Sequence, residues 1–502
     1  MGNTPDTSKT PYETRVMFGR RMITSGAREI TRENVANELL KAITTHNLNR
    51  SEIEYLWQYY KGNQPILNRI KTVRPEICNR IVENRANEIV SFKVGYLCGE
   101  PIQYVSRTGE EESVSGVNQL NEWMFAEDKA SQDQEVVEWQ MICGTAYRMV
   151  LADEIVPQSD DEIAEVYADE APFEMYTLDP RNTFIVYSND IAHDPLMAVK
   201  YVADDQNQNI FTIYTNKFVF EVINGIVTSV MLNTLGVIPI FEYPANNARL
   251  GSFEIVLPLL DEMNNLDSNR MDGVEQVIQA FIKFINCDID LTEYEEFLAK
   301  GAIKVSSSDG RNADVDTVTT DLNQSQSQTL KEDVYQTILT ICGMPNRNGG
   351  SSTSDTGAAV LLRDGWSLAE ARAKDSEHMF KKAERKMLRL VLKICREKAK
   401  TLPIPYLRDI NMQFTRRNYE NIQSKSQVLD TMLNNPKVHP LLAFESCGLF
   451  IDPEQAYKLS MDYYEEQMNR WEPVEVDDDD ETEEDVRVNG QFSEGSEEET
   501  QA

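Results

Sequence analysis

One stretch of this sequence restricts the possible folds more than any other: between Pro345 and Pro403 the chain contains no proline. The second part of this stretch consists mainly of strong helix formers, namely Ala, Leu, Glu, Lys and Arg. A helix over 357–400 would be about 65 Å long at about 1.5 Å per residue. Gly365 and Trp366 interrupt the pattern, and we expect a kink there. The sequence therefore predicts one long, kinked helix.

The two sides of this helix differ in chemistry. The apolar positions are Val360, Leu361, Leu368, Met379, Phe380, Met387, Leu390, Val391 and Ile394. The opposite face carries Lys381, Lys382, Arg385, Lys386 and Arg389. The helix is thus expected to bury one face and to present a basic stripe on the other.

A polar loop over 343–356 precedes the helix and is rich in Gly, Ser and Asn. Met344 is its only bulky apolar residue, and Arg347 supplies its only full positive charge. The loop is long for a plain connector between two helices. Its other hydrogen-bonding side chains include Asn346, Asn348, Ser351, Ser352 and Thr353.

The rest of the chain alternates helical and strand-like patterns, which predicts a mostly helical α+β fold. Short strands are expected between about 150 and 250, with Asn224-Gly225 as a hairpin turn. The helices expected from apolar spacing cover 32–61, 75–98, 117–150, 253–284, 326–341, 422–434, 440–446 and 453–471. Beyond Trp471 the chain is acidic and almost without apolar residues, which predicts disorder.

Charge and composition exclude several classes of protein. The formal net charge is −34, which disfavours a sequence-reading DNA binder and a binder of anionic membranes. The seven cysteines are scattered without Cys-x-x-Cys spacing and are expected to be reduced. No secretory signal and no apolar stretch of membrane-spanning length is present.

Sequence motifs of catalysis are also absent. The chain contains no Gly-x-x-x-x-Gly-Lys-Ser/Thr phosphate loop, no His-Glu-x-x-His and no Gly-x-Ser-x-Gly. The four histidines are far apart in the sequence. We therefore expect no catalytic residues, no metal site and no cofactor.

Several segments, in their order, resemble the portal proteins of tailed double-stranded-DNA phages, in the branch common in phages of Gram-positive hosts. Gly95-Tyr96-Leu97-Cys98-Gly99-Glu100-Pro101 is similar to the hallmark turn of that branch. The other similar segments are Tyr59-Tyr60-Lys61-Gly62, Ile238 to Tyr243 with Asn246-Asn247, Asp355 to Ala359, Phe414 to Arg417, and Asp452-Pro453-Glu454. The resemblance covers roughly residues 35–475, and the order of the segments is more specific than any one of them.

The resemblance implies a portal fold with wing, stem, clip and crown. Its expected parts are a flexible arm (1–34), the wing (35–256), a stem helix (257–284), the clip (285–325), a second stem helix (326–342), a tunnel loop (343–356), a long wing helix and strand (357–420), the crown (421–471) and a disordered acidic tail (472–502).

The resemblance also implies a function: a ring of twelve subunits at one capsid vertex, forming the channel for DNA packaging and ejection. The implied partners are other copies of the chain, double-stranded DNA, the terminase motor, head-completion or adaptor and tail proteins, scaffold and the major capsid protein, without a membrane. The protein would be found in the virion, and in the host cytoplasm during assembly.

Physical arguments agree with a DNA channel. An acidic wall repels DNA, over about 8–10 Å at physiological salt, although the acidity could instead serve only solubility. Asn346, Arg347, Asn348, Ser351, Ser352 and Thr353 are the candidates for weak, reversible contacts with phosphates. The alternative for this loop is a solvated connector.

The basic stripe and the overall function each leave alternatives. Arg385 and Arg389 either face solvent or pair with an acidic surface of the neighbouring subunit. Two other functions remain open on the sequence alone, namely a carboxylate-dependent, nuclease-like enzyme on an α+β fold and another structural protein of the virion.

Overall fold

The computed structural model describes residues 19–108, 110–157, 159–205, 208–278, 281–285, 292, 314–318, 324–346, 365–416, 422–450 and 453–471. The chain forms two compact units, the first ending at Gln427 and the second beginning at Val428. The predicted acidic tail lies outside the described residues.

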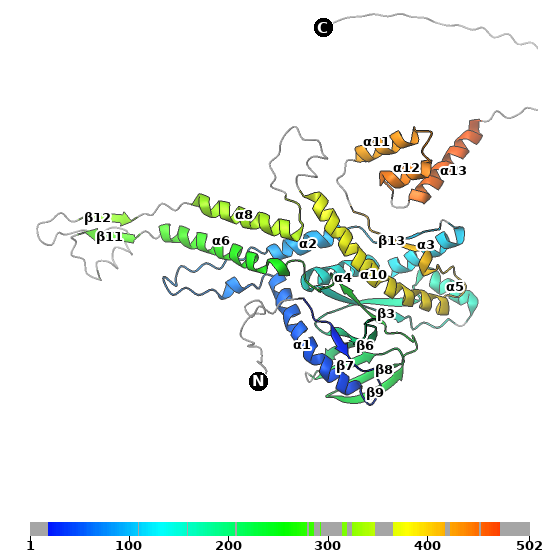
Figure 1. The fold of residues 1–502 in the computed structure, drawn as a ribbon, viewed down its shortest axis with the longest axis horizontal. Helices are drawn as coiled ribbons and strands as arrows, with labels where there is room; N and C mark the ends of the chain where they lie inside the picture. Colours follow the sequence, from blue (N-terminus) through cyan, green and yellow to red (C-terminus); the bar gives the residue numbers. More distant parts are fainter. Residues whose placement is uncertain are drawn as a thin grey trace, which may run out of the picture. The chain divides into compact units, whose positions relative to one another are not determined.

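Both helices and strands contribute to the fold (Figure 1). The α-helices are α1 (Val35–Tyr60), α2 (Arg85–Cys98), α3 (Glu111–Ala126), α4 (Lys129–Cys143), α5 (Asp160–Asp169), α6 (Leu257–Ile278), α8 (Gln324–Cys342), α10 (Trp366–Lys398), α11 (Ile422–Leu433), α12 (Pro440–Cys447) and α13 (Pro453–Trp471). Short 3-10 helices are η1 (Pro65–Asn68), η2 (Glu254–Val256) and η3 (Leu407–Asp409).

The strands are β1 (Ile23–Ser25), β2 (Gln103–Ser106), β3 (Thr145–Ala152), β4 (Phe173–Leu178), β5 (Thr183–Ser188), β6 (Pro195–Ala203), β7 (Asn209–Tyr214), β8 (Phe218–Ile223), β9 (Ile226–Leu232), β10 (Ile240–Pro244), β11 (Phe281–Ile285), β12 (Asp314–Val318) and β13 (Ile410–Gln413). They form a six-stranded sheet in the order β1-β5-β6-β7-β8-β9, a three-stranded sheet β10-β3-β4, and the pairs β11-β12 and β13-β2. Strands β5 to β9 run antiparallel to their neighbours, whereas β1 pairs with β5 in parallel. The mostly helical α+β prediction is confirmed.

Local sequence explains several element boundaries. The turn between β8 and β9 has positive φ at both Asn224 and Gly225, as the two central residues of a type I′ hairpin require. Helix α4 ends at Gly144, whose φ is +80°. A side chain there would lie 2.1 Å from the backbone oxygen of Arg249, so only glycine fits.

Three predictions about the first unit are wrong. The helix predicted over 117–150 is divided by Asp128, in a left-handed conformation, and gives way to β3 after Gly144. The helix predicted from residue 75 begins only at Arg85, because the preceding residues run extended along α6. The arm predicted as flexible over 1–34 is packed from Gly19 onward, since Arg20, Ile23 and Ile30 are buried.

The described part of the long helix is α10. Gly365, where the kink was predicted, has φ +81°, and α10 begins at Trp366. At 33 residues it is about 50 Å long. Residues 357–364 lie outside the described residues. The apolar face is confirmed from Phe380 to Ile394, whereas Leu368 is exposed.

A buried ionic network lies where helices and sheets of the first unit meet. Lys129 and Asp133 come from α4, Arg148 from β3 and Glu384 from α10, and all four are almost completely buried. Lys129 pairs with Asp133 and, at 3.1 Å, with Glu384, while Arg148 lies 2.6 Å from Asp133 and 3.4 Å from Glu384. Two positive and two negative charges therefore neutralise one another inside the core.

Two tyrosine hydroxyls complete the network. Tyr104 of β2 and Tyr243 of β10 donate hydrogen bonds of 2.5 and 2.6 Å to the two carboxylate oxygens of Glu384. Burial alone would raise the pKa of Glu384, but the charges of Lys129 and Arg148 and the two hydroxyls lower it to about 2. The carboxylate thus stays charged at physiological pH and connects five separate elements.

The second unit is a small helical body formed by the end of α11 with α12 and α13. Pro440 occupies the first turn of α12, and Gly448, with φ +61°, ends that helix. Phe444 stacks on Phe450 and contacts the ring of Tyr457. The predicted helix bounds of this region are confirmed to within one or two residues.

Replacing Glu384 with Gln should destabilise the protein by about 3–5 kcal/mol, because Lys129 and Arg148 would keep uncompensated buried charge. Urea unfolding at pH 7 measures this loss. The contribution of wild-type Glu384 should disappear as pH falls from its ordinary pKa of 4.5 toward about 2.

The matched control is Glu397→Gln on the same helix, whose carboxylate is exposed and lies 3.8 Å from Lys393. Surface pairs of this kind contribute at most about 1 kcal/mol. Equal destabilisation by both substitutions would contradict the central role of the network.

Candidate functional site

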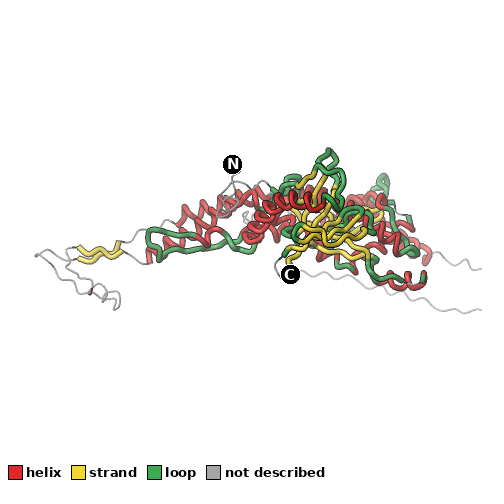
Figure 2. Tube along the Cα trace, turned by 90° about the horizontal axis from the view of Figure 1, so that it is seen from below, coloured by secondary structure: helices red, strands yellow, loops and turns green. Residues whose placement is uncertain are grey.

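A pair of antiparallel helices, α6 and α8, projects from the core of the first unit (Figure 2). Leu257, Leu260 and Met263 of α6 share one buried cluster with Ile338 and Leu339 of α8. Figure 1 shows the two helices side by side, with β11 and β12 between them in the chain. The apolar contact is thus confined to the base of the pair.

Farther from the base, charged groups hold the pair together. The ammonium of Lys331 on α8 lies 3.0 Å from the carboxylate of Asp267 on α6 and 3.0 Å from that of Glu83. Burial and the neighbouring Glu83 carboxylate raise the pKa of Asp267. One lysine therefore joins α6, α8 and the segment that precedes α2.

That segment, residues 69–84, is named the strap: it turns at Arg74–Ile77, and residues 79–83 then run extended along α6. Asn264, Ser268 and Asp272 are buried and lie on one side of α6, four residues apart. Their side-chain oxygens accept the backbone N–H groups of Glu83, Ile81 and Asn79 at 2.8, 3.0 and 2.7 Å.

The spacing of these hydrogen bonds has a simple geometric cause. Four residues of helix advance by about 6.0 Å and two residues of extended chain by about 6.6 Å. Every fourth residue of α6 can therefore serve every second amide of the strap. Asp272 also pairs with Arg69 at 3.1 Å and with Lys71 at 2.9 Å, so the strap is fixed along its length.

The described residues on either side of 347–364 meet at one place. Helix α8 ends in a Schellman cap: the Gly343 N–H donates to Thr340, and the Met344 N–H donates to Leu339 at 2.8 Å. Gly343 has φ +67°, and Met344 is buried. A side chain on Gly365 would lie 3.8 Å from the backbone of Met344 and of Pro345.

A second set of contacts fixes the start of α10 and involves Tyr96, which belongs to the segment Gly95 to Pro101 that is similar to the portal hallmark turn. The Tyr96 hydroxyl donates to Glu370 of α10 at 2.9 Å, and the Tyr96 ring packs against Trp366. The Arg416 guanidinium lies over the same ring and pairs with Glu370 at 2.5 Å. The tyrosine of this motif therefore fixes the first turns of α10.

A cavity lies beside these contacts and is lined in part by Lys93, Asn246, Arg372 and His378. Burial lowers the pKa of the Lys93 amine, the nearby Cys342 thiol opposes that shift, and Arg372 adds to it. The lining of this cavity thus combines Lys93 and Arg372 with the carboxylate of Asp375.

The predicted site residues are distributed as follows. Asn346 is half-buried, and its side-chain oxygen accepts a hydrogen bond of 3.2 Å from Gln336 of α8. Arg347, Asn348, Ser351, Ser352 and Thr353 lie outside the described residues. Arg385 and Arg389 are exposed on α10 beside Lys382 and Lys386, and none of these four pairs with another described residue of the chain. Lys381, by contrast, pairs with Glu377 at 3.3 Å.

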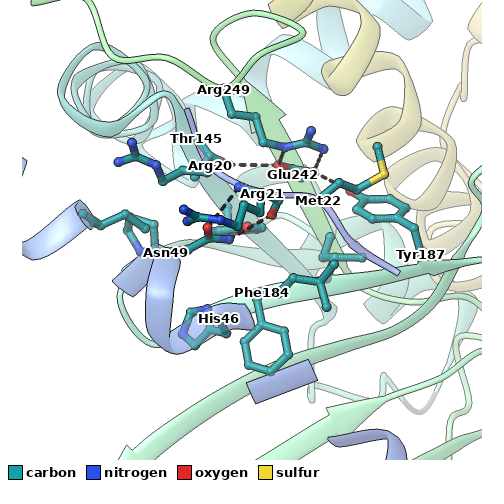
Figure 3. A pocket seen from close by; sticks show the side chains of 15 residues that line it. Arg20, Arg21, Met22, His46, Asn49, Thr145, Phe184, Tyr187, Glu242 and Arg249 are labelled. Carbon is teal, nitrogen blue, oxygen red and sulfur yellow. Dashed lines mark hydrogen bonds and ion pairs between the residues drawn. The ribbon is translucent and has the colours of Figure 1, made fainter. Parts of the chain in front are cut away.

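A second cavity, drawn in Figure 3, is a junction of ion pairs. Arg20 pairs with Glu52 at 3.2 Å and with Glu254 at 2.6 Å, and Glu242 pairs with Arg249 at 2.6 Å. His46 stacks on Phe184, and burial lowers its pKa to about 4, so it is neutral at physiological pH. These ion pairs neutralise the charges of the junction, although the Arg20 Nη1 atom has no hydrogen-bond partner among the described residues.

Sequence patterns did not reveal the groups that position the site. Asn264, Ser268 and Asp272 have a helical spacing of four, but polar residues at that spacing ordinarily predict a solvent-exposed helix face. Glu384 falls within the predicted buried face of α10, next to Phe380 and Met387, and this was the available signal.

In the described part of the chain, no group of three or more His, Cys, Asp or Glu side chains is placed to hold a metal ion. No described helix is both long and apolar enough to cross a membrane. The described residues provide a helix pair joined by ion pairs, two fixed chain ends on either side of 347–364, and a buried ionic network in the core.

Comparison with known families identifies the class of protein. A family model described as "Phage portal protein, SPP1 Gp6-like" matches residues 39–474. The chain belongs to this family of phage portal proteins. It is a structural, non-enzymatic component of the virion, located at the capsid vertex.

Two solved structures are also similar, with 10% sequence identity and a TM-score of 0.42 each. One is described as the neck of an empty gene transfer agent particle computed with C6 symmetry; the match covers 72% of this chain and 90% of that chain. The other is described as the virion of a native gene transfer agent particle, with 80% and 94% covered. No curated protein sequence matches.

Replacing Ser268 with Ala should loosen the strap, because the Ile81 amide would lose its acceptor at a cost of about 1–3 kcal/mol. Hydrogen exchange of the peptide that covers 78–84 should become about tenfold faster or more. Mass spectrometry measures this exchange. Glu262→Ala on the exposed side of α6 is the control, and equal exchange in both variants would show that the side chain does not hold the strap.

Proposed function

We propose that this portal protein closes into a ring of twelve subunits around an axial channel for DNA packaging and ejection. The observation that supports it best is the closed loop: the Schellman cap of α8 and the start of α10 bring the ends of 347–364 together. A loop presented from one point by two fixed helices can reach into a channel without disturbing the subunit that holds it.

The parts expected from the family resemblance fit the described elements with small changes. In this proposal α6 and α8 form the stem, although α6 ends at Ile278 and is followed by β11, where the sequence predicted helix to 284. The two-stranded pair β11-β12 belongs to the clip, most of which lies outside the described residues. The wing contains the sheets with α10, and the crown contains α12 and α13.

The loop contacts DNA only weakly in this proposal. Asn346, Arg347, Asn348, Ser351, Ser352 and Thr353 provide hydrogen-bond donors and one full positive charge per subunit. Many strong phosphate contacts would bind DNA tightly and impede its passage. The net charge of −34 per subunit opposes such adhesion over the rest of the wall.

The ring also docks other proteins. The clip receives the terminase motor during packaging and the head-completion and tail proteins afterwards, while scaffold and the major capsid protein surround the ring. These partners follow from the portal role and move DNA or build the capsid, so the portal itself needs no catalytic residue.

Deleting 347–354 should reduce the DNA packaged per particle, because the contacts of the loop with the moving duplex would be lost. The contacts at both ends of the loop are retained, so rings should still form, as electron microscopy of the purified variant would verify. Normal DNA content in particles with intact variant rings would refute the role of the loop.

The basic stripe of α10 should contribute to subunit pairing in the ring. Reversing Arg385 and Arg389 to Glu should shift the protein from rings toward monomers, because both side chains are exposed and pair with none of the described residues of their own chain. Native mass spectrometry at low salt measures the distribution. Reversal of Lys400, an exposed lysine near the end of the helix, is the control. If the double variant still formed rings normally, the basic stripe of α10 would face solvent and would not contribute to subunit pairing.

A further inference from the structure

The stem elements form a layer with two different edges. Helix α6 contacts both α8 and the strap, and Lys331 of α8 also reaches Glu83 at the end of the strap. Figure 1 shows the rest of the strap, the blue loop, on the side of α6 away from α8. The strap before Glu83 therefore forms one edge of this layer, and the outer face of α8 forms another.

The strap edge is apolar and basic. Ile70 is 84% exposed and Val73 is 75% exposed, and Arg69 and Lys71 beside Ile70 are tied to α6 by their ion pairs with Asp272. The strap contains four basic and two acidic side chains. Arg69 and Lys71 pair with Asp272 and Arg74 pairs with Glu76, whereas the exposed Arg80 pairs with no carboxylate of the described residues. Two exposed aliphatic side chains close together favour burial against another surface.

The α8 edge has the complementary character. Leu330, Asp333, Thr337 and Ile341 follow one another at helical spacing and are all exposed, Leu330 by 50% and Ile341 by 40%. Glu332 is exposed beside them. The Thr337 hydroxyl donates to the carbonyl of Asp333 at 2.8 Å, which satisfies it within the helix. The outer stripe of α8 thus combines aliphatic side chains with carboxylates.

A ring made of identical subunits needs two different surfaces that fit each other, because each subunit meets its neighbours head to tail. Resting on the ring proposed above, we propose that the strap edge of one copy packs on the outer face of α8 in the next copy. Ile70 and Val73 contact the aliphatic stripe of α8, and the basic strap faces Asp333 and Glu332. The partner is a second copy of this chain.

Disulfide trapping tests the contact directly. In the full chain, Val73→Cys combined with Leu330→Cys should form disulfides between subunits on mild oxidation. Denaturing gels would show a ladder of covalent oligomers that continues to the complete ring, because each subunit carries both edges. Each single variant controls for the native cysteines. Rings without a ladder would overturn the contact but leave the proposed ring intact.

A charge substitution provides the second test. Ile70→Asp with Val73→Asp should raise the protein concentration needed for half-maximal ring assembly at least about tenfold, because two apolar contacts become carboxylates facing carboxylates. Ile191→Asp, at an aliphatic position that is fully exposed on another part of the unit, should have no effect.

The outcomes separate the two proposals. Failure of the wild-type chain to form any ring would refute both. Normal assembly of the strap variant would refute the contact alone. Normal rings that no longer enter capsids would also refute it, since the strap would then bind a different virion protein.

Discussion

Electrostatic neutrality in the core is the constraint on which the rest of the structure depends. Lys129, Asp133 and Arg148 come from the consecutive elements α4 and β3, and Glu384 comes from α10, 236 residues after Arg148. Burying any one of these charges without the others would be costly. Since Tyr104 and Tyr243 bind the same carboxylate, two further strands are held to α10. The network therefore fixes where α10 crosses the sheets, which apolar packing alone would specify less sharply.

The position of α10 in turn determines where the loop begins and ends. The helix is continuous from Glu384 back to Trp366, and there Tyr96, Glu370 and Arg416 hold its first turns. On the other side of the loop, the cap of α8 is buried through Met344 in the cluster that also holds the base of α6. The buried ionic network, the first turns of α10 and the base of the α6–α8 pair are thus linked by continuous contacts within the first unit.

Much of this architecture follows from sequence, and the exceptions have identifiable causes. Apolar spacing located α1, α6, α8 and most of the buried face of α10, because those patterns depend on nearby residues. The division of the predicted 117–150 helix depends on Asp128 and Gly144, which both have positive φ, and the backbone of Arg249 packs against Gly144 from about a hundred residues away. The strap could not be predicted, because its amides are satisfied by side chains about 190 residues away. Of the predicted loop residues, Asn346 lies at the end of the anchored segment, and the others remain predictions.

The contact between the two ends of the loop has a consequence for how such proteins diversify. Because Gly365 lies against Met344 and Pro345, the helices are already joined in space before the intervening residues are considered. Lengthening a connection whose ends are fixed in this way costs little, about 0.6 kcal/mol for each doubling of its length. We therefore expect the scaffold on both sides to tolerate changes in the length and composition of 347–364 without changes of its own.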